Sequence, residues 1–186
     1  METLLLNDSK KINDVKLFFE KNEIEINLKN SLHVEDISLK TTGILILSEF
    51  QPSYLNPFID YSIKNNIKIL AVGRALISLI STLNNSKNKL DRSFSGDGST
   101  FISLGSNLAE IIGGAGPLKT NYFNDFEITI ENIPNHFLPS SINLNNGCIE
   151  AIESEGKGNI IGIVWPIFST NKMPSRFENI LSWISD

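Results

Sequence analysis

The segment 67–83 constrains the fold more than any other part of the chain. Residues 67–72 are apolar except for Lys68, and Gly73 separates them from a helical pattern that begins at Arg74. A short apolar run of this kind is typical of a strand buried on both faces, as in the parallel sheets of α/β proteins. Glycine tolerates the backbone conformation that a sharp strand-to-helix turn requires. We therefore predict a buried strand, a tight turn at Gly73 and a helix over 74–83.

Strand and helix patterns alternate along the rest of the first half. Apolar residues recur at helical spacing at Ile12, Val15 and Phe19, and a second helix is expected over 57–65. Strands are expected at 3–6, 23–26, 43–47 and 67–72. Strands that alternate with helices predict a mostly parallel sheet covered on both faces, which is a three-layer α/β sandwich.

The second half is richer in strands. We expect strands at 100–104, 126–130, 149–152 and 160–164, and a C-terminal helix that presents Phe177, Ile180, Leu181 and Ile184 on one face. The polar stretch 84–99 is expected to be one long, mobile loop. Neither a repeat nor a linker divides the chain, so residues 1–186 are interpreted as a single domain.

Composition excludes several classes of function. The formal net charge is −5 and the basic residues are dispersed, which argues against nucleic-acid binding. One cysteine and two histidines are too few for a zinc site, and a lone cysteine forms no internal disulfide. We expect no metal and no cofactor. The sequence shows neither a signal-peptide pattern nor an apolar stretch long enough to span a membrane, so a cytoplasmic protein without a membrane partner is expected.

Five segments, in order, resemble the class I glutamine amidotransferases. Residues 67–77 are similar to the nucleophile elbow of these enzymes, an apolar strand that ends in a small residue, a cysteine and often Arg-Gly. Residues 105–113, 121–125, 146–153 and 162–166 resemble segments of the γ-glutamyl-γ-aminobutyrate hydrolase branch, including its Asp-Gly-x-Ile-Glu-Ala-Ile-Glu strand and its Gly-Val-Gln-Trp-His-Pro-Glu motif. The resemblance spans about residues 43–184 and implies a flavodoxin-like three-layer fold.

The same resemblance implies that the catalytic residues of the family are missing. Gly73 stands where the nucleophilic cysteine is expected. The histidine and glutamate should follow Trp165, but the chain continues with Pro166, Ile167 and Phe168. The glycine-rich oxyanion loop is replaced by Ser-Glu-Phe-Gln at 48–51, and the accessory His-His by Asn-Asp at 124–125. Thiol chemistry needs a nucleophile, a base and oxyanion donors together, so we predict a catalytically inactive homologue.

Other residues are weaker candidates for chemistry. Cys148 is expected to be a small buried hydrophobe far from the elbow. Ser78 is expected on a helix surface, and His33 and His136 on exposed segments. Asp97 belongs to a Gly-Asp-Gly turn without the remaining calcium-ligand spacing. The glycines at 113–116 follow a helical pattern, so they indicate a helix-terminating turn rather than a phosphate loop.

Binding is the function that this pattern leaves open. The start of the helix after Gly73, together with Arg74, is a candidate anion site, to which Glu49, Asn124 and Asp125 also contribute in our prediction. The competing interpretation is that Arg74 forms a structural salt bridge at the helix start.

Three hypotheses follow from the sequence. The first is a non-catalytic subunit or regulatory partner, paired with an active relative, a synthetase subunit or a second copy of itself. The second is a small-anion binder that uses the remnant pocket. The third is a γ-glutamyl amide hydrolase with rearranged catalytic groups.

Overall fold

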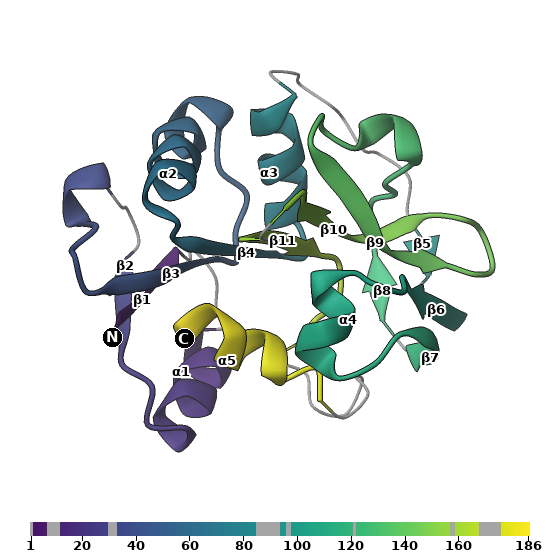
Figure 1. Ribbon diagram of the computed structural model, residues 1–186, viewed down its shortest axis with the longest axis horizontal. Helices are drawn as coiled ribbons and strands as arrows, with labels where there is room; N and C mark the ends of the chain where they lie inside the picture. Colours follow the sequence, from purple (N-terminus) through teal and green to yellow (C-terminus); the bar gives the residue numbers. More distant parts are fainter. Residues whose placement is uncertain are drawn as a thin grey trace.

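The computed structural model describes residues 2–6, 12–29, 33–84, 94–95, 98–120, 122–156, 159–167 and 176–186. Within these residues one large sheet has the strand order β2-β1-β3-β4-β11-β10-β9-β6-β7 (Figure 1). Helices cover both of its faces, so the predicted α/β class and three-layer arrangement are confirmed. Among the described helices, none is long and apolar enough to cross a membrane.

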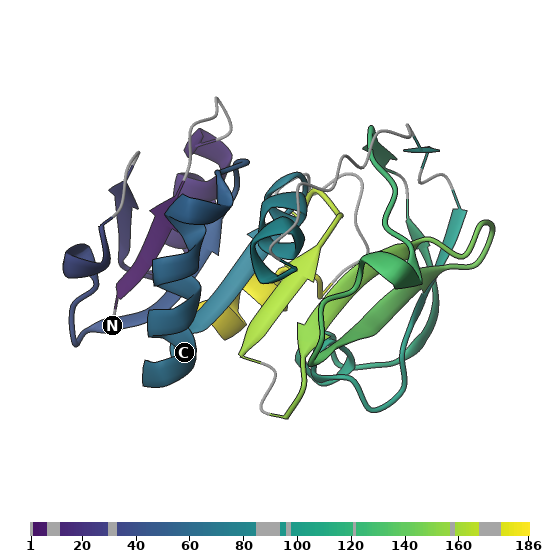
Figure 2. The ribbon, with the colours of Figure 1, turned by 90° about the horizontal axis from the view of Figure 1, so that it is seen from above.

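The sheet has a parallel half and an antiparallel half, which Figure 2 shows at opposite ends of the molecule. The parallel half contains β1 (Glu2–Leu6), β2 (Ile26–Lys29), β3 (Thr41–Ile46), β4 (Lys68–Val72) and β11 (Ile160–Ile163). The antiparallel half contains β10 (Ile149–Ser154), β9 (Phe137–Asn143), β6 (Gly98–Ile102) and β7 (Gly116–Thr120). The short strands β5 (Phe94–Ser95) and β8 (Phe123–Asn124) pair separately.

The helices divide between the two faces of the sheet (Figure 1). One face carries α2 (Pro52–Asn65) and α3 (Ala75–Leu83), and the other carries α1 (Ile12–Lys21), α4 (Asn107–Ile112) and α5 (Asn179–Ser185). Two 3-10 turns, η1 (Val34–Asp36) and η2 (Ile130–Asn132), lie in connections. The helix expected at 57–65 begins five residues earlier, because Pro52 occupies the first helical position, where proline is favoured.

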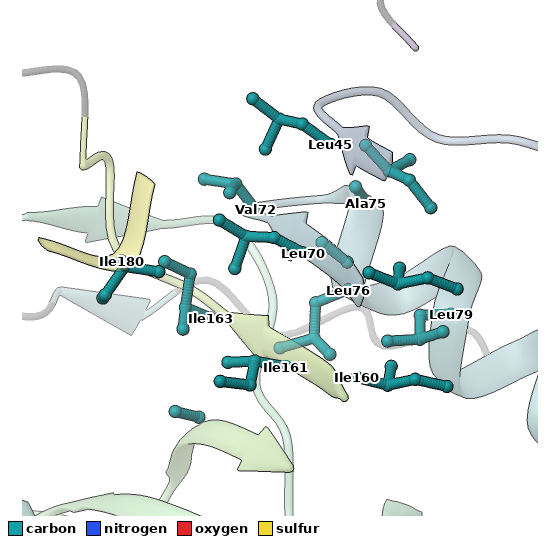
Figure 3. Close-up of a cluster of buried hydrophobic side chains, with 14 of the residues drawn as sticks. Leu45, Leu70, Val72, Ala75, Leu76, Leu79, Ile160, Ile161, Ile163 and Ile180 are labelled. Atoms are coloured by element: carbon teal, nitrogen blue, oxygen red, sulfur yellow. The ribbon is translucent and has the colours of Figure 1, made fainter. Parts of the chain in front are cut away.

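The core continues through the central strands to both faces of the sheet. Figure 3 shows Leu79 of α3 beside Ile160, and Ile180 of α5 beside Ile163. All four side chains are buried. Alternate residues of one strand point to opposite faces, so a strand covered by helices on both sides is apolar throughout. This packing explains the apolar runs from which the central strands were predicted.

Several sequence expectations were wrong in detail. No strand forms over 126–130: Phe126 and Ile128 are buried in an alternating pattern, but this segment continues into η2. The second strand lies at Ile26–Lys29 rather than 23–26, because Glu23 adopts a positive φ of 56° in the preceding turn. Strands β7 and β9 were not predicted. The expected loop at 84–99 contains β5 and the start of β6, and its residues 85–93 and 96–97 lie outside the described part.

Candidate functional site

The predicted turn between β4 and α3 is present. Gly73 has a φ of +65°, and its backbone N–H donates to the carbonyl oxygen of Ile163 on the neighbouring strand β11, at 2.8 Å. A Cβ atom built on Gly73 would meet no other group within 4 Å. The turn therefore has the left-handed conformation of a nucleophile elbow and open space at its tip, but no side chain.

Arg74, the next residue, joins two carboxylates. Its Nε and Nη2 donate to the two oxygens of Glu49, at 2.9 and 3.0 Å, and its Nη1 donates to Oδ2 of Asp125 at 2.6 Å. All three side chains are about half exposed. The hydrogen bonds that Arg74 donates to Glu49 and Asp125 raise the pKa of its guanidinium, so the group stays charged.

The fold thus brings together four of the residues that the sequence placed in a remnant ligand site: Gly73, Arg74, Glu49 and Asp125. Asn124 is the last residue of β8 and directly precedes Asp125. The ion pairs match the salt-bridge interpretation of Arg74. Whether the cluster also binds an anion remains a prediction.

The loop after β3, where the sequence resemblance would place oxyanion donors, is hydrogen-bonded to α3. The backbone N–H of Phe50 donates to Oγ of Ser78 at 2.8 Å. The expectation for Ser78 was wrong: its side chain is 4% exposed and faces this loop instead of lying on a helix surface. Residues 75–82 of α3 are all buried, because the helix packs against α2 and against β4 and β11 of the sheet. The Phe50 amide is therefore already used as a donor.

The segment after β11, where the family has its histidine and glutamate, turns apolar side chains inward. Trp165 is fully buried and contacts Phe177 edge-on, with ring centroids 5.0 Å apart. Pro166 follows, Ile167 is 6% exposed, and the Ile167 N–H donates to the Trp165 carbonyl at 2.9 Å. Phe168 lies outside the described residues. At the described positions this segment supplies packing and offers no acid or base.

The remaining candidates lie in structural settings. Cys148 is 5% exposed, as expected, but its Sγ also donates to Oε1 of Glu127 at 2.9 Å. Burial and this carboxylate raise the pKa of Cys148 to about 12, so it is a neutral thiol at physiological pH. His33 and His136 are exposed, and Gly113 ends α4 with a φ of +77°, as predicted. Asp97 lies outside the described residues.

A buried carboxylate network was not predicted. Glu150 on β10 is 1% exposed and accepts hydrogen bonds from the hydroxyls of Thr100 and Tyr122, from Nδ2 of Asn143 at 2.8 Å and from Nε1 of Trp165 at 3.3 Å. Burial raises the pKa of Glu150, while the donors oppose that shift. Its sequence signal was an acidic residue between Ile149 and Ala151 in a predicted buried strand. The network connects β10, β6, β9, the residue before β8 and the chain after β11.

A metal centre has no set of ligands in the described part of the chain. No group of three or more His, Cys, Asp or Glu side chains there is arranged to hold a metal ion.

The fold is shared with solved structures of a GMP synthase subunit, a CTPS glutaminase domain and a glutamine amidotransferase. The chain superposes on a Thermoplasma acidophilum protein described as belonging to a GMP synthase, with a TM-score of 0.72 and 13% identity, covering 98% of this chain and 92% of that one. For the glutaminase domain of Trypanosoma brucei CTPS with bound acivicin, the TM-score is 0.69 and the identity 12%, over 99% and 90% of the two chains. A glutamine amidotransferase from Thermotoga maritima matches with a TM-score of 0.58 and 10% identity, over 90% and 76%.

The fold is therefore that of the class I glutamine amidotransferase domains. Neither a protein-family model nor a curated protein sequence matches the chain.

Proposed function

We propose that this protein is a catalytically inactive homologue of the class I glutamine amidotransferases that works as a subunit or regulatory partner of another protein. The observation that carries the proposal is the elbow itself. Its backbone keeps a left-handed turn, which glycine adopts without strain, yet Gly73 supplies no nucleophile. The geometry of the turn is therefore present here without the side chain that would carry its usual chemistry.

The surroundings of the elbow support the same conclusion. Catalysis by this fold needs a base near the nucleophile and amide donors for the oxyanion. The chain after β11 offers a tryptophan, a proline and an isoleucine instead of a base. The Phe50 amide in the loop after β3 already donates to Ser78. A hydrolase with rearranged groups would need a nucleophile elsewhere, and burial holds the pKa of the only thiol, Cys148, at about 12.

The partner proposal is supported by two structural neighbours whose names describe parts of larger enzymes. One structural neighbour is named as a subunit of GMP synthase, and this chain spans 92% of it. Another is the glutaminase domain of CTPS. The sequence motifs favour the γ-glutamyl-γ-aminobutyrate hydrolase branch as the active relatives. We also propose that the chain is a single domain and that it is located in the cytoplasm.

The anion-binding alternative has one observation in its favour and one against it. Arg74 and the start of α3 lie together at the elbow, as an anion site requires. Two carboxylates already occupy the Arg74 guanidinium, so the Glu49–Arg74–Asp125 cluster has a formal charge of −1 and an anion would have to displace one of them. We therefore rank this function second.

The test is to purify the protein from its own cells with a tag at either end and to determine the mass and composition of the complex. We expect a second polypeptide in a fixed stoichiometric ratio with both tags and not with the tag alone. Recovery of only the free monomer from fresh extract, across ionic strengths, would overturn the partner proposal. Recovery of a pure homodimer would restrict the partner to a second copy of the chain.

A further inference from the structure

A groove of about 470 Å³ lies between α4 and α5. These helices cover the face of the sheet opposite to α3, so the groove is separate from the elbow site (Figure 1). Its lining includes Asn107, Glu110 and Ile111 from α4, Asn179 and Trp183 from α5, and Asp186 after it. The volume falls in the range of small-molecule sites, which are commonly about 300–1,000 Å³.

Hydrogen bonds hold the two walls of the groove in place. The carboxylate of Glu153 on β10 accepts from the backbone N–H groups of Asn107 and Leu108, at 2.9 and 3.1 Å, which fixes the start of α4 to the sheet. Nδ2 of Asn179 on α5 donates to the carbonyl of Ile111 on α4 at 3.3 Å. The groove is thus a preformed feature between two connected helices.

The same bonds orient the two asparagine amides. Nδ2 of Asn107 donates to Oε1 of Glu153 at 3.1 Å, and Nδ2 of Asn179 donates to a backbone carbonyl. The partner of Asn107 is a carboxylate oxygen and the partner of Asn179 is a carbonyl oxygen, and both of these atoms can only accept hydrogen bonds. Each amide must therefore present its NH₂ group to its partner. Within the described part of the chain neither Oδ1 atom accepts a hydrogen bond, so both are available as acceptors.

The charged residues that line the groove are both acidic. Glu110 and Asp186 carry carboxylates, and none of the lining residues is basic. Within the described part of the chain, neither carboxylate forms an ion pair. Trp183 adds an aromatic wall, and its ring already attracts the Lys68 ammonium, which lies 5.5 Å from the ring centroid outside the groove lining.

We propose that this groove binds a small organic cation through its ammonium or guanidinium group. Two carboxylates and two amide oxygens accept hydrogen bonds from the cationic group, while Ile111 and the Trp183 ring contact its apolar part. The inference does not depend on the proposed function, because none of these residues belongs to the elbow.

The test is a titration with n-butylammonium and n-butylguanidinium, in which binding is measured by the change in tryptophan fluorescence and in the melting temperature. Neutral n-butanol is the matched probe, and sodium chloride keeps the ionic strength constant. The chain has two tryptophans, and Trp165 is fully buried away from the groove, so Trp183→Phe should remove the fluorescence response. Glu110→Gln removes one carboxylate, and Glu131→Gln on η2 is the matched control at an exposed acid.

We expect saturable binding of both cations, with dissociation constants in the millimolar range. Glu110→Gln should weaken it about two- to fivefold, as for a partly exposed charge pair, and Glu131→Gln should leave it unchanged. A response to butanol equal to that of the cations, equal affinity in Glu110→Gln and wild type, or no saturation by about 50 mM would each overturn the proposal. If Trp183→Phe fails to fold, the cation affinities of Glu110→Gln and wild type, measured by thermal stability, still test the proposal.

Discussion

Arg74 holds the Glu49 carboxylate through two hydrogen bonds, 2.9 Å from Nε to Oε2 and 3.0 Å from Nη2 to Oε1. Residue 49 lies in the loop after β3 and residue 74 is the N-cap of α3, so this contact ties that loop to the elbow. Paired donors and acceptors of this kind favour one planar arrangement of arginine and carboxylate. An anion that approaches Arg74 must compete with it.

This competition predicts an order of anion affinity among three proteins. Glu49→Gln makes the charge of the cluster neutral and should increase phosphate or acetate binding about two- to fivefold over wild type. Arg74→Ala should abolish it. Calorimetric titration at low ionic strength measures the order, and added salt should weaken any binding. Equal affinity in wild type and Arg74→Ala, or no binding by any of the three, would remove the anion-site hypothesis.

Glutamine and γ-glutamyl amines should not be turned over. With the nucleophile and base missing, only binding and a residual oxyanion effect remain, about 10³–10⁴-fold over the uncatalysed rate at best. Ordinary enzymes reach about 1–10³ s⁻¹. Glutamate or ammonia release is measured with protein free of contaminating hydrolase, beside an active amidotransferase as positive control. Release at an ordinary enzymatic rate would contradict the inactive-homologue proposal.

Gly73→Cys should yield a reactive thiol without hydrolytic activity. The new side chain meets no other group within 4 Å, so it fits, and no histidine or carboxylate of the described residues lies within that distance to act as its base. Iodoacetamide at pH 8 should alkylate residue 73 and leave Cys148 intact, because burial raises the pKa of Cys148 to about 12. Peptide mapping by mass spectrometry distinguishes the two.

The same substitution should destabilise the fold through its backbone. A φ of +65° is strained for a residue with a Cβ, at about 1–3 kcal/mol. Gly73→Ala, which has the same strain but no thiol, should lose an equal free energy of unfolding in urea titration. Glutamine turnover by Gly73→Cys would reveal a base that the structure does not place at the elbow.

The elbow could be predicted from the sequence because its determinants are local. An apolar strand, one glycine and a helical pattern within seventeen consecutive residues define it. The strands of the parallel half were found for the same reason. In contrast, β9 contains Pro139 and two serines and β7 contains Gly116 and Pro117, which are poor strand signals. These strands form because they complete the antiparallel half of the sheet, which is a tertiary effect.

Contacts between distant residues limited the prediction of the site. The family resemblance placed Glu49, Arg74 and Asp125 together, but it did not show that the carboxylates bind the arginine, across 25 and 51 residues. The Glu150 network joins residues up to 50 positions apart. Local patterns give no information on such pairings, although a lone acid in a buried strand signals that a partner must exist.

Glu150 should be among the most important single residues for stability. Glu150→Ala leaves the Tyr122 hydroxyl, the Asn143 amide and the Trp165 indole N–H without this acceptor in the interior, and a loss of about 3 kcal/mol or more is expected. The Thr100 hydroxyl keeps the Ser141 hydroxyl as a partner at 2.8 Å. Glu131→Gln, an exposed control, should change the free energy of unfolding by less than about 0.5 kcal/mol. Equal stability of Glu150→Ala and wild type in denaturant titration would show that the network is not structural.

Gly43 should be required for docking of the C-terminal helix. A Cβ at this position of β3 would lie 2.1 Å from the carbonyl oxygen and 2.4 Å from Cγ1 of Ile184, near the end of α5. Gly43→Ala therefore forces α5 away from the sheet, and overpacking of this kind costs about 1–3 kcal/mol. Gly114→Ala is the matched control, because its Cβ would meet no group within 4 Å and its backbone needs no positive φ. A comparison of the two variants in urea should show a lower midpoint for Gly43→Ala alone, with hydrogen exchange increased in α5. Equal midpoints would mean that α5 moves aside without loss of packing.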